Sequence, residues 1–150
     1  MAYFGTRFVR VSLIGAAALG LVASPASAVV KNFMSVINAG QEVPATTSNS
    51  FGVGFYTFDT QTKALCWSIS YSVNDLSSAE NNAHIHGPAS PGADGLIIIG
   101  LPAGSPKNGC QAIDAATEAA LKKGQLYVNI HTSTNPGGEI RGQIIPVKGK

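Results

Sequence analysis

Two of the three histidines in this 150-residue chain lie one residue apart, in the segment AHIHGPASPGADG (83–95). The third, His131, lies in YVNIHTSTNPGGEIRGQ (127–143). Residues i and i+2 of a β-strand project from the same face, about 6.5–7 Å apart, so His84 and His86 would converge. Imidazoles at this spacing suit copper or zinc, which histidine binds at about 2 Å. If their strands pair, the pattern predicts one metal site at His84, His86 and His131.

Other uses of these histidines stay open on the sequence alone. Strand histidines that precede GP and TS turns can also donate structural hydrogen bonds to backbone carbonyls. A general base would need a nucleophile, but Ser90, Ser105 and Ser133 lie in turn sequences without a nucleophile-elbow pattern. A hydrolase triad is therefore not expected.

The residues beside the histidine motifs predict a surrounding polar patch, made of Asn82, Asn129, Glu139 and Arg141. The asparagines could orient imidazole rings from behind the metal ligands. Glu139 and Arg141 alternate along one strand, where they could form an ordering ion pair or a patch in which Arg141 attracts an anion. Glu42 or Glu139 could also reach the metal, which would favour zinc.

Alternation of apolar and polar residues predicts the strands that position these side chains. The clearest run is ALCWSISYSV (64–73), with Leu65, Trp67 and Ile69 on one face. Further predicted strands are 33–38, 51–58, 83–86, 96–101, 126–131 and 139–146. Turn sequences such as PGADG and NPGG separate them. About seven short strands indicate an all-β, antiparallel, Greek-key-like sandwich or barrel.

One segment departs from the alternating pattern. AIDAATEAALKKG (112–124) is rich in alanine and ends in two lysines and a glycine, which is typical of a helix C-terminus. We expect one short helix here, packed beside the sheet.

Residues 1–28 have the features of a cleaved signal peptide. Arg7 and Arg10 precede an apolar run at 11–23, and Ala26-Ser27-Ala28 supplies a small-residue cleavage site. A spanning helix needs about 20 apolar residues, so a retained anchor is the less favoured alternative. We expect a single mature domain at 29–150, secreted or periplasmic, with no membrane span after the leader is removed.

Loss of the leader removes two arginines and leaves eight Lys and Arg against eight Asp and Glu. This balance does not favour nucleic acid, whose recognition needs a concentrated basic surface. Cys66 and Cys110 are the only cysteines, and export makes a disulfide between them the favoured state. Two free buried thiols, or metal ligation, are the alternatives.

Three segments together resemble the CHRD family, which is named after chordin: GQEVP (40–44), AHIHGPASPGADG (83–95) and GQLYVNIHTSTNPGGEIRGQI (124–144). The resemblance spans roughly residues 33–146 and implies a β-rich extracellular module. It implies no general biochemical activity. The growth-factor antagonism of chordin does not transfer to a lone domain that lacks the other modules of chordin. The cysteine pair is not part of the motif.

These observations together predict a non-enzymatic binding or structural module with an unidentified extracellular or periplasmic partner. It would hold one copper or zinc ion through three histidines. The alternative is a superoxide-dismutase-like or other redox metalloenzyme, by analogy with an H-x-H pair and a distant histidine on a β-sandwich. The chain has no fourth histidine to complete a four-imidazole site.

Overall fold

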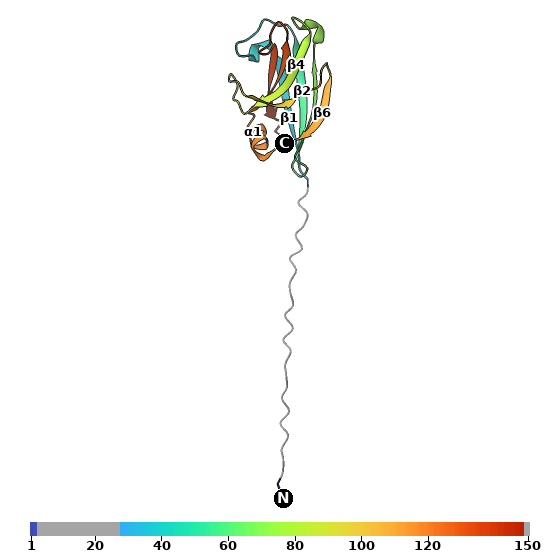
Figure 1. Cartoon of the computed structure of the whole chain (residues 1–150), viewed down its shortest axis with the longest axis vertical. Coiled ribbons are helices and arrows are strands. Elements are labelled where there is room, and N and C mark those ends of the chain that lie inside the picture. Colours follow the sequence, from blue (N-terminus) through green and yellow to red (C-terminus); the bar gives the residue numbers. More distant parts are fainter. Residues whose placement is uncertain (3–27, 149–150) are drawn as a thin grey trace.

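The structure is a computed structural model in which residues 1–2 and 28–148 are described. The predicted leader, apart from its two ends, lies outside the described residues. Within them the chain forms eight strands, one α-helix and two short 3₁₀ turns (Figure 1). Their bounds are β1 Val30–Asn38, η1 Ala39–Gln41, β2 Phe51–Asp59, β3 Ala64–Tyr71, η2 Val73–Asp75, β4 Glu80–Gly87, β5 Leu96–Gly100, β6 Lys107–Ala112, α1 Ala115–Lys122, β7 Leu126–Thr132 and β8 Ile140–Pro146. The predicted all-β class with one short helix is confirmed.

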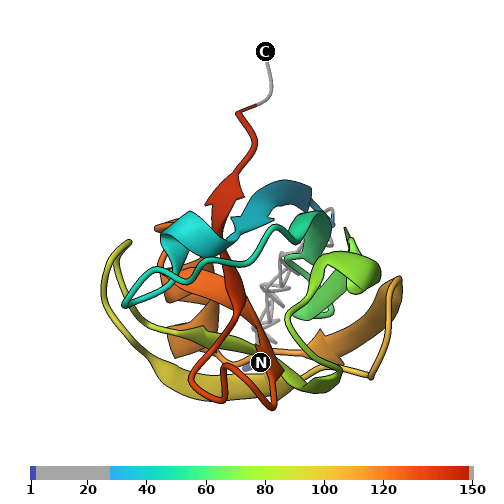
Figure 2. The same cartoon turned by 90° about the horizontal axis from the view of Figure 1, so that it is seen from above.

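All eight strands belong to one antiparallel sheet in the order β5-β4-β7-β8-β1-β2-β3-β6. Several neighbours, such as β4 and β7 or β8 and β1, are not consecutive in the chain, so the connections cross instead of forming a simple meander. The sheet curls around the core, and Figure 2 shows the strands surrounding the interior when the molecule is viewed from above. The curl gives every strand an inner face toward the core and an outer face away from it.

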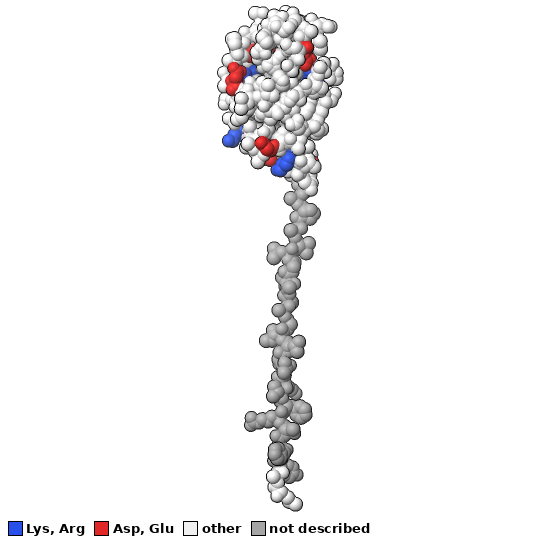
Figure 3. All heavy atoms as spheres, in the orientation of Figure 1, with Lys and Arg blue, Asp and Glu red and all other residues white. Residues whose placement is uncertain are grey.

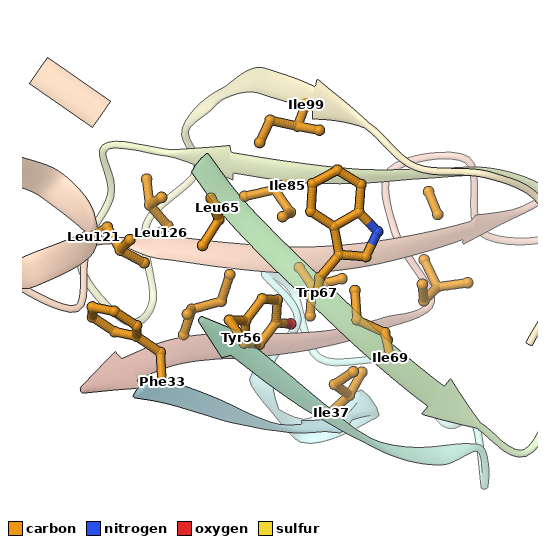
Figure 4. Packing of buried hydrophobic residues seen from close by; sticks show 14 of the residues in the cluster. Phe33, Ile37, Tyr56, Leu65, Trp67, Ile69, Ile85, Ile99, Leu121 and Leu126 are labelled. Carbon is orange, nitrogen blue, oxygen red and sulfur yellow. The ribbon is translucent and has the colours of Figure 1, made fainter. Parts of the chain in front are cut away.

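The inner face carries the hydrophobic core that the alternation predicts. Leu65, Trp67 and Ile69 of β3 are buried, and Figure 4 shows them facing the same interior as Ile85 of β4 and Ile99 of β5. β3 and β4 are far apart in the strand order, so the curled sheet packs against itself. Burying each such side chain contributes roughly 1.5–3 kcal/mol, which opposes the entropy cost of closing the sheet.

The segment before the helix differs from the sequence prediction. β6 was not predicted because KNGCQA lacks apolar alternation, and only Lys107 in it is buried. The helix begins later than expected because the Asp114 side chain accepts a hydrogen bond from the Thr117 N–H and caps it. It ends before Gly124, whose φ of 68° is the left-handed conformation expected there. Leu121 anchors the helix on the core.

Charged side chains are scattered over the face seen in Figure 3, and no continuous basic area is visible on it. Among the described residues, no helix combines the length and the apolar character that crossing a membrane requires.

Cys66 and Cys110 form a disulfide, as predicted, and occupy paired positions on β3 and β6. The bond fastens the edge strand β6 to the sheet and closes a loop with a sequence separation of 44. Because the cross-link restricts the unfolded chain, we predict that replacing both cysteines with alanine lowers the free energy of unfolding by about 3–4 kcal/mol. Urea denaturation of the oxidised protein and the double variant measures this difference. A loss below about 1 kcal/mol would show that the cross-link restrains the unfolded chain little.

Candidate metal centre

The pairing of β4 with β7 brings the three histidines together. The two strands are antiparallel, with His84 opposite Asn129, and Asn82 opposite His131. Ile85, between the two β4 histidines, is fully buried in the core, so His84 and His86 project from the outer face. Ile130 fixes His131 on that face in the same way. The strand pairing on which the three-histidine hypothesis depends is therefore present, and the three histidines converge.

The imidazoles lie close enough to share one ion. One ring nitrogen from each histidine lies within 4.8 Å of the others, and His84 Nδ1 is 3.3 Å from His131 Nε2. Two nitrogens at that separation, each about 2.0–2.1 Å from zinc, would subtend an angle of roughly 110°, the tetrahedral value. Tetrahedral coordination brings every pair of ligand nitrogens to about that separation, so a pair at 4.8 Å would have to close by about 1.5 Å.

Backbone carbonyls orient two of the rings. His86 Nδ1 lies 3.1 Å from the carbonyl of Gly95, and His131 Nδ1 lies 3.0 Å from that of Pro136. A carbonyl only accepts, so each Nδ1 carries the proton and each Nε2 is unprotonated. The Nε2 of His131 accepts a hydrogen bond from His84 Nδ1. His86 Nε2 is buried without a hydrogen-bond partner. This is the arrangement in which a histidine binds a metal through Nε2 while its other nitrogen is held from behind.

The environment keeps the imidazoles neutral. Burial lowers the pKa of all three histidines below the usual value, and for His84 the neighbouring His131 and His86 lower it further. A neutral imidazole is the form that binds a metal, so little proton competition is expected at neutral pH.

A stack of side chains supports the site from one side. The His86 ring is nearly parallel to the ring of Tyr127, with centroids 5.0 Å apart, and the Arg141 guanidinium lies 3.4 Å from the same Tyr127 centroid. Arg141 is almost fully buried, and its guanidinium also donates to the carbonyl of Ala93 and to the carboxylate of Asp94. These contacts hold the β4–β5 loop (88–95) over the outer face of β7 and β8.

The predicted asparagines occupy different environments. Asn82 is exposed on β4, opposite His131. Asn129 is buried between His84 and Arg141, its partners on the two neighbouring strands, and its Nδ2 donates to the carbonyl of Gly137. Among the described residues, neither side chain forms a hydrogen bond with a histidine.

Glu139 faces a different set of groups from Arg141. Its carboxylate accepts hydrogen bonds from four side chains, those of Ser48, Ser77, Thr132 and Asn135. Thr132 follows His131 directly, so the two side chains leave β7 on opposite faces. The carboxylate therefore fastens the ends of the loops around β7 and does not belong to the set of groups that could share an ion with the histidines.

Glu42 is the other carboxylate that the sequence places near the metal. It is buried, and its Oε1 has no hydrogen-bond partner. Burial raises the pKa of the Glu42 carboxyl to about 7, despite the opposing effect of Arg141. It does not share a cluster of metal-ligating atoms with the histidines among the described residues.

Sequence reasoning missed the groups that orient the histidines. The carbonyls of Gly95 and Pro136 carry no sequence signal, because every residue has a carbonyl. Asp94 lies in a turn sequence that reads only as a loop. Tyr127 alternates with Asn129 and His131 on one strand face, and that alternation could have identified it as a ring neighbour of His86.

The fold and the site together define an all-β domain with a three-histidine cluster on the outer face of a curled sheet. The family model described as the CHRD domain matches residues 33–144, so the chain belongs to the CHRD family. No curated protein and no solved structure matches the chain. The sequence resemblance is confirmed by the family match.

The contribution of Glu139 to the stability of the fold should depend on pH. Burial alone would raise the pKa of its carboxyl, but the hydrogen bonds from Ser48, Ser77 and Thr132 outweigh that effect and lower the pKa to about 2. A folded-state pKa below the unfolded value stabilises the protein above about pH 4.5, and this contribution is lost as the pH falls toward 2.

We therefore expect Glu139→Gln to be less stable than the wild type at pH 7 and to lose less stability between pH 5 and about 2. Urea denaturation at several pH values measures how steeply the free energy of unfolding changes with pH in the wild type and in the variant. Asp75→Asn is the control, because the Asp75 side chain is exposed and forms no salt bridge among the described residues. Equal slopes for Glu139→Gln and the wild type would refute the assignment.

Proposed function

We propose that this chain is a secreted or periplasmic CHRD module that binds one copper or zinc ion through His84, His86 and His131. The observation that carries the proposal is the unpaired, buried Nε2 of His86, which lies in a cluster of three converging imidazoles. Buried polar atoms are nearly always paired, so an unpaired nitrogen lone pair inside such a cluster supports a site for a metal ion.

The chemistry of the ligand set supports copper or zinc over harder cations. Magnesium and calcium prefer oxygen ligands, whereas neutral imidazole suits copper and zinc. Three protein ligands leave at least one coordination position for water or for a group from a partner. His84 is only partly buried, which gives an ion access to the cluster from solvent.

The disulfide and the predicted leader support a role outside the cytosol. The disulfide between Cys66 and Cys110 indicates an oxidising compartment. The predicted leader at 1–28 supplies the route, and secretion and periplasmic retention use the same kind of leader. We propose that the module binds or stabilises a partner there and is not an enzyme.

Metal titration tests the site. We predict that the purified apoprotein binds one equivalent of Zn²⁺ or Cu²⁺ by calorimetry, and that His86→Ala weakens binding by about a hundredfold or more. Loss of an outer hydrogen-bond partner alone costs 10–100-fold, and loss of a ligand costs more. At a free metal concentration 100 times the Kd, binding should stabilise the fold by about 2.7 kcal/mol.

Asn81→Ala is the matched control, since it truncates an exposed polar residue of the same strand. It should bind the metal as the wild type does. Failure of the wild type to bind either ion in a stoichiometric manner would leave the histidines with a structural role and refute the proposal.

Copper loading separates the module from the redox-enzyme alternative. We expect the Cu²⁺-loaded protein to give a paramagnetic resonance spectrum with splitting from nitrogen ligands and no superoxide turnover above that of the His86→Ala variant. In the redox-enzyme alternative, the same three histidines hold a redox-active copper ion. Rapid turnover that His86→Ala abolishes would establish the enzyme instead.

A further inference from the structure

A group of apolar side chains lies on the outer face of β1, β2 and the end of β8. Val36 lies opposite Val53 on the paired strands β1 and β2. Met34 lies opposite Phe55 on one side and Ile145 of β8 on the other. The residues between them on β1 and β2 are buried in the interior, so these side chains point outward. The apolar patch comprises Met34, Val36, Phe51, Val53, Phe55 and Ile145.

The apolar patch is exposed to solvent. The exposed fractions of its side chains reach 59% for Phe55, 52% for Phe51, 49% for Ile145 and 41% for Val36. An aromatic side chain can bury about 150–250 Å², and on that scale the six residues together expose roughly 400–500 Å² of apolar surface. A contiguous apolar area of this size is often a binding surface.

The border of the apolar patch on β3 is polar but uncharged. Ser68 lies opposite Phe55, and Ser70 lies opposite Val53. An apolar centre with a polar rim is the usual arrangement of a protein–protein interface. Surfaces that bind membranes add lysines and arginines, which attract anionic lipids, and the patch itself contains neither. The chemistry of the patch therefore favours a protein surface as its occupant.

The shape of the apolar patch fits a second copy of the same chain. A shallow hollow of about 260 Å³ is lined by Phe51, Val53 and Ser70, among others. A cavity of about 150 Å³ holds benzene, so the hollow has room for a phenyl ring. Phe51 and Phe55 lie two residues on either side of Val53, each about 7 Å from it along β2. A two-fold axis that crosses β2 at Val53, in the plane of the interface, seats Phe55 of each copy against Phe51 and the hollow of the other.

Charge and area are also consistent with association of two copies. Residues 29–150 contain eight Lys and Arg against eight Asp and Glu, so no net charge holds two copies apart. Two facing patches would bury roughly 1,000 Å² in total, which is the lower limit for a specific interface and indicates a weak, reversible dimer. We propose that the apolar patch is the interface of a homodimer, in which the outer faces of β1 and β2 of two copies pack about 10 Å apart as stacked sheets do.

The dimer does not depend on the proposed metal centre. The three histidines lie on β4 and β7, whereas the apolar patch is centred on β1 and β2, on the other side of β8 in the sheet. Self-association can therefore be measured in the presence of a chelator, which also prevents a metal ion from bridging two copies. Failure of the protein to dimerise says nothing about the histidines.

The test is sedimentation equilibrium of the protein, expressed from the full sequence and kept in EDTA, at concentrations from about 5 to 500 µM. We expect a reversible equilibrium between monomer and dimer. Phe55→Lys should raise the Kd of the dimer about tenfold or more, because it places a charge in the apolar centre of the interface. Leu96→Lys is the matched control, since it makes a similar change at an exposed apolar residue of β5 and should dimerise as the wild type does.

A pair of variants tests the two-fold arrangement. Phe51→Asp should dimerise as poorly as Phe55→Lys, but an equimolar mixture of the two should associate about tenfold more tightly than either alone. In the mixed dimer the lysine faces the aspartate, and the other contact keeps both phenylalanines.

Circular dichroism reports the folding of each variant, and the concentration dependence of the wild type needs no variant. A wild type that stays monomeric up to about 500 µM would overturn the proposal, whether or not it binds phosphatidylcholine vesicles through Phe55. Equal weakening by Leu96→Lys, unchanged dimerisation of Phe55→Lys, or a mixture that associates no better than the separate variants would also overturn it.

Discussion

The register between β4 and β7 is the constraint on which the site depends. Ile85 and Ile130 are fully buried on the inner face, so they fix which side of each strand points outward. A slip of one residue would expose these side chains to water and turn His84 and His86 into the core. Burial of each isoleucine contributes roughly 1.5–3 kcal/mol, so the core fixes the positions of the histidines more strongly than the single hydrogen bond between His84 and His131 does.

The outer face of these strands is unusual because it is both polar and buried. A curled sheet needs only its inner face for the core, yet all seven residues of β7 are buried. The β4–β5 loop (88–95) covers the outer face, and it is held by side chains of the strands below it, as when Arg141 donates to Ala93. The unpaired atoms of this region, His86 Nε2, Asn129 Oδ1 and Glu42 Oε1, are all acceptors.

The sequence predictions succeeded where an element carries local apolar alternation and failed where its place comes from pairing with distant strands. Period-2 alternation identified β3, because one of its faces is apolar along its whole length. β6 was not predicted, because its place in the sheet comes from pairing with β3 and from the disulfide. Neither leaves an apolar pattern in the sequence KNGCQA. Alternation also placed Glu139 beside Arg141, but β8 begins only at Ile140, after Gly138 with its φ of 135°. The carboxylate of Glu139 consequently meets a group of hydroxyls.

Local periodicity and composition were sufficient to predict the class of fold and the shared face of His84 and His86, and to favour a disulfide between the only two cysteines. The sequence also supplied the motifs of the CHRD family. The tertiary structure alone decided that His131 meets the other histidines, that Gly95 and Pro136 orient the rings, and that Glu42 lies buried beside Asn129. His131 and the two β4 histidines, like Glu42 and Asn129, lie far apart in the chain and meet only in the folded protein. Gly95 and Pro136 lie close in sequence to the histidines that they orient, but they act through backbone carbonyls, which are the same in every amino acid.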